Sequence, residues 1–222
     1  MTDQLRAALV IGGACRIGRA IARALHQSGY AVAIHAQTAV SDAEALREEI
    51  ARARGRAAVV PADLADHAAV VALIGAAVRA VGPLHLLVNI AARPEPDEFG
   101  TLERDRFDRQ FAVNLRAPLF LAQAFALQAG AGASIVNVLD QRALKPTMQC
   151  ASYTLAQSAL HAATRLLAQA LAPAVRVNAV VPARLPEEIA SAVVYLAGAR
   201  SVTGVTLEVG GGQHPPDASI AE

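Results

Sequence analysis

Short runs of aliphatic and β-branched residues alternate along the chain with longer stretches whose apolar positions recur at helical spacing. Most of the short runs are apolar throughout, which is typical of strands in a parallel sheet covered on both faces. The pattern predicts strands at residues 7–11, 31–35, 57–60, 84–89, 134–139, 175–181 and 205–209. It predicts helices at about residues 16–28, 41–55, 66–81, 101–128, 151–172 and 186–197. Because strand and helix alternate strictly, we expect an α/β fold with a doubly wound parallel sheet of about seven strands.

Several helix boundaries carry recognisable signals. Ser41 is followed by Glu44 three residues later, which predicts a capping box at the start of the second helix. Gly82-Pro83 predicts the end of the third helix. Pro186 stands where proline is tolerated, in the first turn of the last helix.

Composition narrows the class of protein. The 222 residues show no internal repeat or shift in composition, which predicts one domain over residues 1–222. Apolar residues make up 54%, and 20 basic side chains balance 19 acidic ones, which excludes a disordered chain and a basic footprint for nucleic acid or membrane. No apolar run is long enough to span a membrane, and the first residues lack the pattern of a secretory signal. Cys15 and Cys150 form neither a disulfide framework nor a metal-ligand cluster, so we expect a cytoplasmic protein without a metal.

A glycine-rich turn follows the first predicted strand and opens the first helix. It reads Gly12-Gly13-Ala14-Cys15-Arg16-Ile17-Gly18. Small residues let the backbone approach a pyrophosphate, and the N–H groups at a helix start carry partial positive charge. Its place in a βαβ unit favours a dinucleotide-binding loop over an ordinary turn, although Arg16 stands where the common fingerprint has glycine. The candidate cofactor contacts are Gly12, Arg16, Ile17 and Gly18, while Cys15 is expected to be a small buried filler.

The carboxyl ends of the next strands complete this candidate cofactor site, because a dinucleotide lies along that edge of a Rossmann-type sheet. His35 and Gln37 should face the adenosine ribose, where this sequence has neither the acid typical of NAD sites nor the arginine typical of NADP sites. Asp63 and Leu64 should face the adenine. Asn89 and Ala91 should line the back of the cofactor, although each of these residues alone also fits ordinary turn chemistry.

The chain resembles the short-chain dehydrogenase/reductase family over nearly its whole length. The landmarks are the Gly12–Gly18 loop, Asp63-Leu64, Asn89-Ile90-Ala91, Asn114, Tyr153 and Val177-Asn178-Ala179. Within that family it looks most like the pteridine reductase-like members. Those also have Arg-Ile-Gly or Arg-Leu-Gly in the loop, and an aspartate thirteen residues before the tyrosine, here Asp140.

The resemblance implies hydride transfer from NADP(H) or NAD(H), with NADP(H) favoured, to a pterin or a small carbonyl compound. Tyr153 is implied as the proton donor, since a phenol with a pKa near 10 stays protonated at neutral pH. A surface tyrosine is the competing interpretation. The resemblance implies that Asp140 shares or relays the proton or holds a pterin amine, and that Asn114 holds a water or orients the backbone near the site.

Gln157 is the main departure from the family, which has lysine four residues after the tyrosine. This spacing puts Tyr153 and Gln157 on one helix face. The family's lysine contacts the nicotinamide ribose and lowers the pKa of the phenol; a unit charge about 4 Å away contributes roughly 4 kcal/mol at an effective dielectric constant of about 20. Glutamine can contact the ribose but carries no charge, which predicts weakened or altered catalysis. Arg142 and the single lysine of the chain, Lys145, are alternative sources of positive charge.

Three further departures concern the substrate side. The family continues after the sixth strand through Pro-Gly into a substrate-covering segment, whereas here only residues 183–185 separate Pro182 from Pro186. Either the pocket is open or this sequence lacks a stretch of the natural protein. Pteridine reductases have an aromatic residue near the position of Pro94, and NADP-dependent members often have arginine at the position of Gln37.

Two hypotheses follow. The first is an NAD(P)(H)-dependent oxidoreductase in which Tyr153, Asp140, Asn114 and Gln157 form the catalytic group. The second is a nucleotide-binding pseudoenzyme with a role in assembly or sensing, based on Gln157 and the missing covering segment. The resemblance also implies a homodimer or homotetramer built on the two long helices, and a small-molecule substrate.

Overall fold

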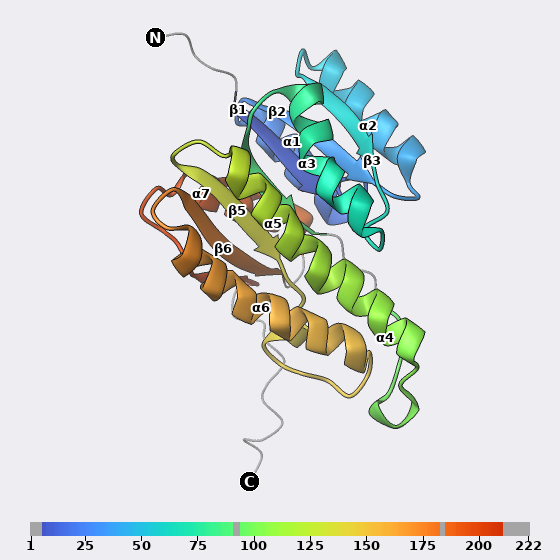
Figure 1. Ribbon diagram of the computed structural model, residues 1–222. Coiled ribbons are helices and arrows are strands. Elements are labelled where there is room, and N and C mark those ends of the chain that lie inside the picture. The colour runs from blue at the N-terminus through green and yellow to red at the C-terminus, as the bar shows by residue number, and fades with distance from the viewer. Residues whose placement is uncertain (1–5, 91–93, 183–184, 211–222) are drawn as a thin grey trace.

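The strands form a single parallel sheet. The computed structural model describes residues 6–90, 94–182 and 185–210, and its seven strands follow the order β3-β2-β1-β4-β5-β6-β7 (Figure 1). This confirms the predicted doubly wound α/β fold. The strands are β1 (Arg6–Ile11), β2 (Tyr30–Ala36), β3 (Ala57–Pro61), β4 (Leu84–Asn89), β5 (Ala133–Val138), β6 (Val175–Pro182) and β7 (Thr206–Val209).

Helices connect the successive strands and have nearly the predicted boundaries. Among the described residues, no helix is both long and apolar enough to cross a membrane. The helices are α1 (Arg16–Gln27), α2 (Val40–Arg52), α3 (His67–Val81), α4 (Arg104–Phe111), α5 (Ala117–Gln128), α6 (Ala151–Leu171) and α7 (Pro186–Gly198), with short helical turns η1 (Phe99–Thr101), η2 (Ala112–Arg116) and η3 (Gln141–Ala143).

Each face of the sheet is covered by a different set of helices. On one face, Ala8 and Val10 of β1 belong to a core formed with α1, α2 and α7. On the other face, Leu9 of β1 belongs to a core formed with α3, α5 and α6, which lie on the same side of the sheet (Figure 1). Side chains of both orientations are therefore buried, which explains why the strand sequences are apolar throughout rather than alternating.

The reversal of strand order beside β1 fixes where a ligand can bind. β1 pairs with β2 on one side and with β4 on the other, and Ile11 at the end of β1 pairs with Asn89 at the end of β4. Connections leave these two strands toward opposite sides of the sheet, which opens a crevice at their carboxyl ends. The predicted cofactor residues follow these strand ends, so the topology gathers them at one edge.

The second helix begins earlier than predicted, so the expected Ser41 cap is wrong. α2 starts at Val40 after Ala39, which makes no side-chain capping hydrogen bond. Ser41 therefore lies inside the first turn. Glu44, its expected capping-box partner, instead forms an ion pair with Arg47 one turn along the helix.

The long helix predicted over residues 101–128 is divided into three parts. α4 is followed without interruption by the π-helical turn η2, and α5 continues after it. A π-helical turn widens the backbone by one residue and is frequent at functional sites. The apolar pattern averages over such a local change, which explains why the sequence predicted one regular helix.

His35, in β2, contacts both the glycine loop after β1 and the residue after β3. Its side chain is 2% exposed. The Gly12 N–H donates to Nδ1 at 3.2 Å, and Nε2 lies 3.1 Å from the Ala62 carbonyl oxygen, which requires the tautomer protonated at Nε2. Burial lowers the pKa of His35. Its neutral ring therefore fastens the start of the loop to β2 and to the end of β3.

The His35 contacts predict a pH-dependent stability. Because the folded protein lowers the pKa of His35, the unfolded chain binds a proton more readily, and the stabilisation is complete above the ordinary pKa of about 6.5. It is lost as the pH falls from that value toward the lowered pKa of the folded state. We expect urea unfolding at pH values from about 7.5 to about 5 to show the stability advantage over His35→Gln shrinking with falling pH. Parallel stability curves for the two proteins would contradict this account.

Candidate active site

The turn after β1 is shaped for a close backbone approach. A Cβ placed on Gly18 would lie 2.2 Å from the Gly12 carbonyl oxygen and 2.7 Å from the Cα of Gly13, so only glycine fits. Gly12 has φ of 80°, in the left-handed region that favours glycine. Arg16, the first residue of α1, is exposed beside this loop, and Ile17 is half-buried behind it. A pyrophosphate can thus reach the N–H groups at the start of α1, so the loop fits a dinucleotide.

Cys15 occupies the capping position of α1 and is exposed, so the prediction of a buried filler is wrong. Its backbone is extended, and its Sγ accepts a hydrogen bond from the Gly18 N–H at 3.4 Å. A capping residue lies outside the helix, at the surface of the loop. The thiol takes the place of the hydroxyl or carboxylate oxygen that usually caps a helix.

The adenosine side of the edge differs in part from expectation. The His35 side chain points inward to Gly12 and Ala62 rather than toward a ribose, whereas Gln37 is exposed directly after β2. Asp63 is exposed, and its Oδ1 accepts from the Ala65 N–H at 2.8 Å, while Leu64 is buried. No acidic side chain stands among residues 35–38 to repel a 2′-phosphate.

Asn89 starts a buried polar chain that links two strands to α6. Its Nδ2 donates to Asn137 Oδ1 at 2.8 Å, and Asn137 Nδ2 donates to Thr164 Oγ1 at 2.9 Å. The Oδ1 of Asn89 is buried and has no hydrogen-bond partner among the described residues. It leaves an acceptor at the edge of the sheet, where a bound ligand can donate to it. Ala91, predicted beside it, lies outside the described residues.

Tyr153 and Asp140 come together as predicted. The Tyr153 side chain is 2% exposed, and its hydroxyl donates to Asp140 Oδ2 at 3.3 Å. Burial raises the pKa of Tyr153, and the negative charge and hydrogen bond of Asp140 raise it further. Arg142, whose Nη1 lies 3.1 Å from Asp140 Oδ2, lowers the pKa of Tyr153 through its positive charge. The balance keeps the phenol protonated, which is the form that can donate a proton.

Gln157 has a contact that the sequence did not predict. It is buried one turn after Tyr153, and its Oε1 accepts a hydrogen bond from the Asp140 N–H at 3.0 Å. The amide therefore fastens the residue after β5 to α6, and so holds Asp140 beside Tyr153. Its Nε2 can still donate to a ribose oxygen, so the predicted cofactor contact stays a prediction.

Asn114 lies in the π-helical turn η2. Its Nδ2 donates to both the backbone oxygen and the side-chain Oε1 of Gln110, each at 2.9 Å. Its Oδ1 is buried and has no partner among the described residues. These contacts hold the widened turn and leave one acceptor for a water or ligand. A catalytic role for Asn114 stays a prediction.

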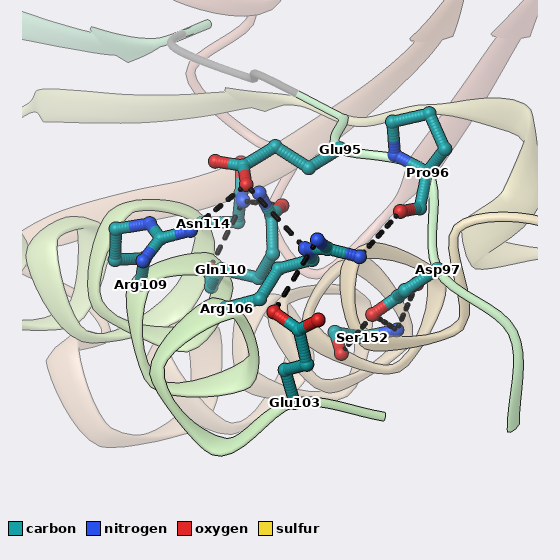
Figure 2. A network of polar contacts seen from close by, with 9 residues as sticks. All are labelled: Glu95, Pro96, Asp97, Glu103, Arg106, Arg109, Gln110, Asn114 and Ser152. Atoms are coloured by element: carbon teal, nitrogen blue, oxygen red, sulfur yellow. Dashed lines mark hydrogen bonds and ion pairs between the residues drawn. The ribbon is translucent and has the colours of Figure 1, made fainter. Parts of the chain in front are cut away.

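The loop after β4 is held by polar contacts that the sequence did not predict. Figure 2 shows it between α4 and α6, with Arg106 donating to the Pro96 carbonyl oxygen at 2.9 Å and Arg109 pairing with Glu95 at 3.1 Å. Asp97 is 5% exposed and contacts Ser152 at the start of α6. The only signal in the sequence was an acidic loop followed by an arginine-rich helix, and such segments are more often solvated.

The predicted lack of a covering segment after β6 stays a prediction. β6 ends at Pro182 and α7 begins at Pro186, and two of the three residues between them, 183 and 184, lie outside the described part of the chain. Pro94 is exposed and offers no aromatic ring. A cavity of about 570 Å³ lies beside the start of α6, lined by loop residues 98–100 and 146–149 and by Ala151, Thr154 and Leu155.

Comparisons with known proteins agree with this geometry. The family model described as short chain dehydrogenase matches residues 6–193. The chain is 30% identical to pteridine reductase 1 of Leishmania tarentolae, covering 92% of this chain and 95% of that protein. It is 32% identical to L-xylulose reductase of Homo sapiens, covering 93% and 96% of the two chains.

A solved structure extends the similarity to three dimensions. FolM alternative dihydrofolate reductase 1 from Brucella canis, complexed with NADP, is 37% identical and superposes with a TM-score of 0.92 over 98% of both chains. The family match and the sequence identity agree with the two features of the site described above, the Gly12–Gly18 loop and the contact between Tyr153 and Asp140. The chain belongs to the short-chain dehydrogenase/reductase family and is an NAD(P)-dependent oxidoreductase of that family.

Proposed function

We propose that this protein is an NADP(H)-dependent reductase that delivers hydride to a pterin or a small carbonyl compound, with Tyr153 as the proton donor. The observation that carries the proposal is the Tyr153 hydroxyl, buried and protonated, 3.3 Å from Asp140 at the carboxyl end of β5. The similarity to a pteridine reductase and to an alternative dihydrofolate reductase supports a pterin. The similarity to L-xylulose reductase supports a small carbonyl compound.

The residues of the chain supply the proton chemistry. A bound nicotinamide supplies the hydride in this family. The Tyr153 hydroxyl gives its proton to the oxygen or nitrogen that gains the electron pair. Asp140 is about a quarter exposed, so it can pass a proton from solvent back to Tyr153. Gln157 and Arg142 hold the Asp140 backbone and carboxylate in place for this relay.

NADP(H) is the proposed cofactor. The similar FolM structure was solved with NADP. In this chain, residues 35–38 carry no acid that would repel a 2′-phosphate, and Arg16 stands exposed at the glycine loop. The buried acceptor of Asn89 and the Gly12–Gly18 loop fit the rest of a dinucleotide.

A nucleotide-binding protein without turnover is the second candidate. It rests on Gln157, whose amide makes a hydrogen bond where the family has a charged ammonium. Such a protein would bind NADPH through the same loop but would transfer no hydride. The two candidates therefore differ in turnover and not in cofactor affinity.

The proton-donor role predicts a large loss of activity in Tyr153→Phe. Removal of a general acid typically lowers the rate by about 10²–10⁴-fold. We expect a loss of this size in NADPH oxidation with dihydropterin, quinone and small carbonyl substrates, while NADPH binding measured by fluorescence titration is retained. Asp140→Asn should lose activity but less of it, because the phenol remains. Full activity of Tyr153→Phe would contradict the assigned role.

Gln157→Lys separates the two candidate functions. The lysine adds positive charge one turn from Tyr153 and removes the hydrogen bond to Asp140, whereas the control Gln157→Met removes the hydrogen bond without adding charge. For an active enzyme we expect measurable turnover in the natural protein and a lower turnover in Gln157→Met. Binding of NADPH without turnover, with turnover appearing only in Gln157→Lys, would establish the second candidate. Absence of binding to NADPH and NADH would contradict both.

We also propose that the protein is a homodimer or homotetramer built on α5 and α6. Four large apolar side chains on these helices are exposed, Phe120 by 38%, Leu127 by 87%, Leu155 by 48% and Leu166 by 65%. Phe120 and Leu127 line a groove of about 520 Å³ together with Leu167 and Leu171 of α6. Exposed apolar area of this kind is typical of a face that another chain covers.

The assembly is tested by placing charge on this face. We expect Leu127→Glu combined with Leu166→Glu to lower the mass measured by light scattering to that of the monomer. Val71→Glu, at an exposed apolar position on α3, is the matched control and should leave the mass unchanged. A monomeric natural protein, or a double variant with unchanged mass, would contradict the proposed interface.

A further inference from the structure

The start of α6, which carries Tyr153 in its first turn, has no cap of its own. Cys150 precedes the helix with φ of 56°, in the left-handed region that is costly for a residue other than glycine, and its side chain makes no capping hydrogen bond. The first N–H groups of a helix need partners from outside it. The partner in this structure comes from a residue 55 positions earlier in the chain.

Asp97 provides that cap. The Ser152 N–H lies 3.2 Å and 3.3 Å from the two carboxylate oxygens of Asp97, and the Ser152 hydroxyl donates to Oδ2. The Ala151 N–H donates to the Asp97 backbone oxygen at 3.3 Å. Asp97 is 5% exposed, so these bonds are shielded from water, and its charge meets the positive end of the helix.

Asp97 is itself held in place from the opposite side. The preceding residues are fixed to α4, since Arg106 donates to the Pro96 carbonyl oxygen and also lies near Glu95 and Glu103, while Arg109 pairs with Glu95 (Figure 2). The loop after β4 therefore joins α4 to the first turn of α6. A loop whose side chains contacted only water could not fix the position of the first turn of α6.

We propose that Asp97 is a positioning residue that fixes the first turn of α6, and with it the Tyr153 hydroxyl, against Asp140 at the end of β5. Ser152, the residue that Asp97 binds, directly precedes Tyr153, so a displacement of this turn moves the phenol. Gln157 holds the same pair one turn further along. The two contacts together define the Tyr153–Asp140 geometry from both sides of the tyrosine.

The experiment compares Asp97→Ala with Asp97→Asn, which keeps one acceptor oxygen, and with Asp66→Ala. Asp66 caps α3 by accepting from the Ala68 N–H at 2.9 Å, so its variant loses a helix cap away from Tyr153. Three quantities are measured: kcat and KM for NADPH, amide exchange over residues 151–155, and the fluorine NMR spectrum of protein labelled with 3-fluorotyrosine. The chain has three tyrosines, and Tyr153→Phe assigns the relevant resonance.

We expect Asp97→Ala to lower kcat roughly 10- to 100-fold, the loss that a misplaced reacting group produces, with KM for NADPH unchanged. Amide exchange in the first turn should accelerate, the Tyr153 resonance should move or broaden, and Asp97→Asn should restore part of each. Asp66→Ala should show none of these changes. If Asp97→Ala does not fold, the proposal is supported when Asp97→Asn shows the same changes in kcat, amide exchange and the Tyr153 resonance to a smaller extent.

The readout on kcat rests on the proposed reductase function, whereas the NMR readout does not. A natural protein without turnover would overturn the reductase function, and the Tyr153 resonance would still decide the role of Asp97. If kcat and the Tyr153 resonance in both Asp97 variants match those in Asp66→Ala, Asp97 is merely a structural cap and the proposal is wrong.

Discussion

The parallel pairing of the strands is the constraint on which the site depends. In a parallel sheet every strand ends at the same edge, so residues from distant parts of the sequence meet there without any direct attraction between them. Gly12 and Asp140 follow β1 and β5, Asn89 ends β4, and all three reach this edge for that reason alone. The order reversal between β2 and β4, on either side of β1, then opens the space that a dinucleotide needs.

Pairing brings these residues to one edge, but it does not fix their side chains. Their side chains are fixed by buried or partly buried polar contacts that strands and loops make with α6, namely Asn89–Asn137–Thr164, Asp140–Gln157 and Asp97–Ser152. Each joins a strand or loop on the sheet edge to one face of the same helix. Because unsatisfied polar groups are costly in a dry interior, each contact admits few alternative positions. α6 is thereby held in a definite register against the sheet, with Tyr153 at its first turn.

The sequence predicted what depends on periodicity and on local motif order. Strand and helix positions, the sheet class and the Tyr153–Asp140 pair follow from apolar spacing and from residues matched to a family. It did not predict the Asp97 cap, because the two partners are 55 residues apart and an acidic loop looks the same whether it is solvated or buried. Nor did it predict that Cys15 is exposed or that Val40 starts α2, since helix starts are decided by individual backbone conformations that an apolar pattern does not record.

Gln157 changes which positive charge lowers the pKa of Tyr153. In the family pattern an ammonium stands one turn along the same helix, whereas in this chain the amide at that position makes a neutral hydrogen bond to the Asp140 backbone. The positive charge that acts on Tyr153 belongs instead to Arg142, on the far side of Asp140. The side chains of Arg142 and Asp140 are 33% and 26% exposed, so solvent and salt screen this pair more than a buried ammonium. A phenol governed in this way stays protonated at neutral pH, but its raised pKa makes it a weaker acid than a phenol beside an ammonium, which is the physical reason to expect weaker catalysis in this chain.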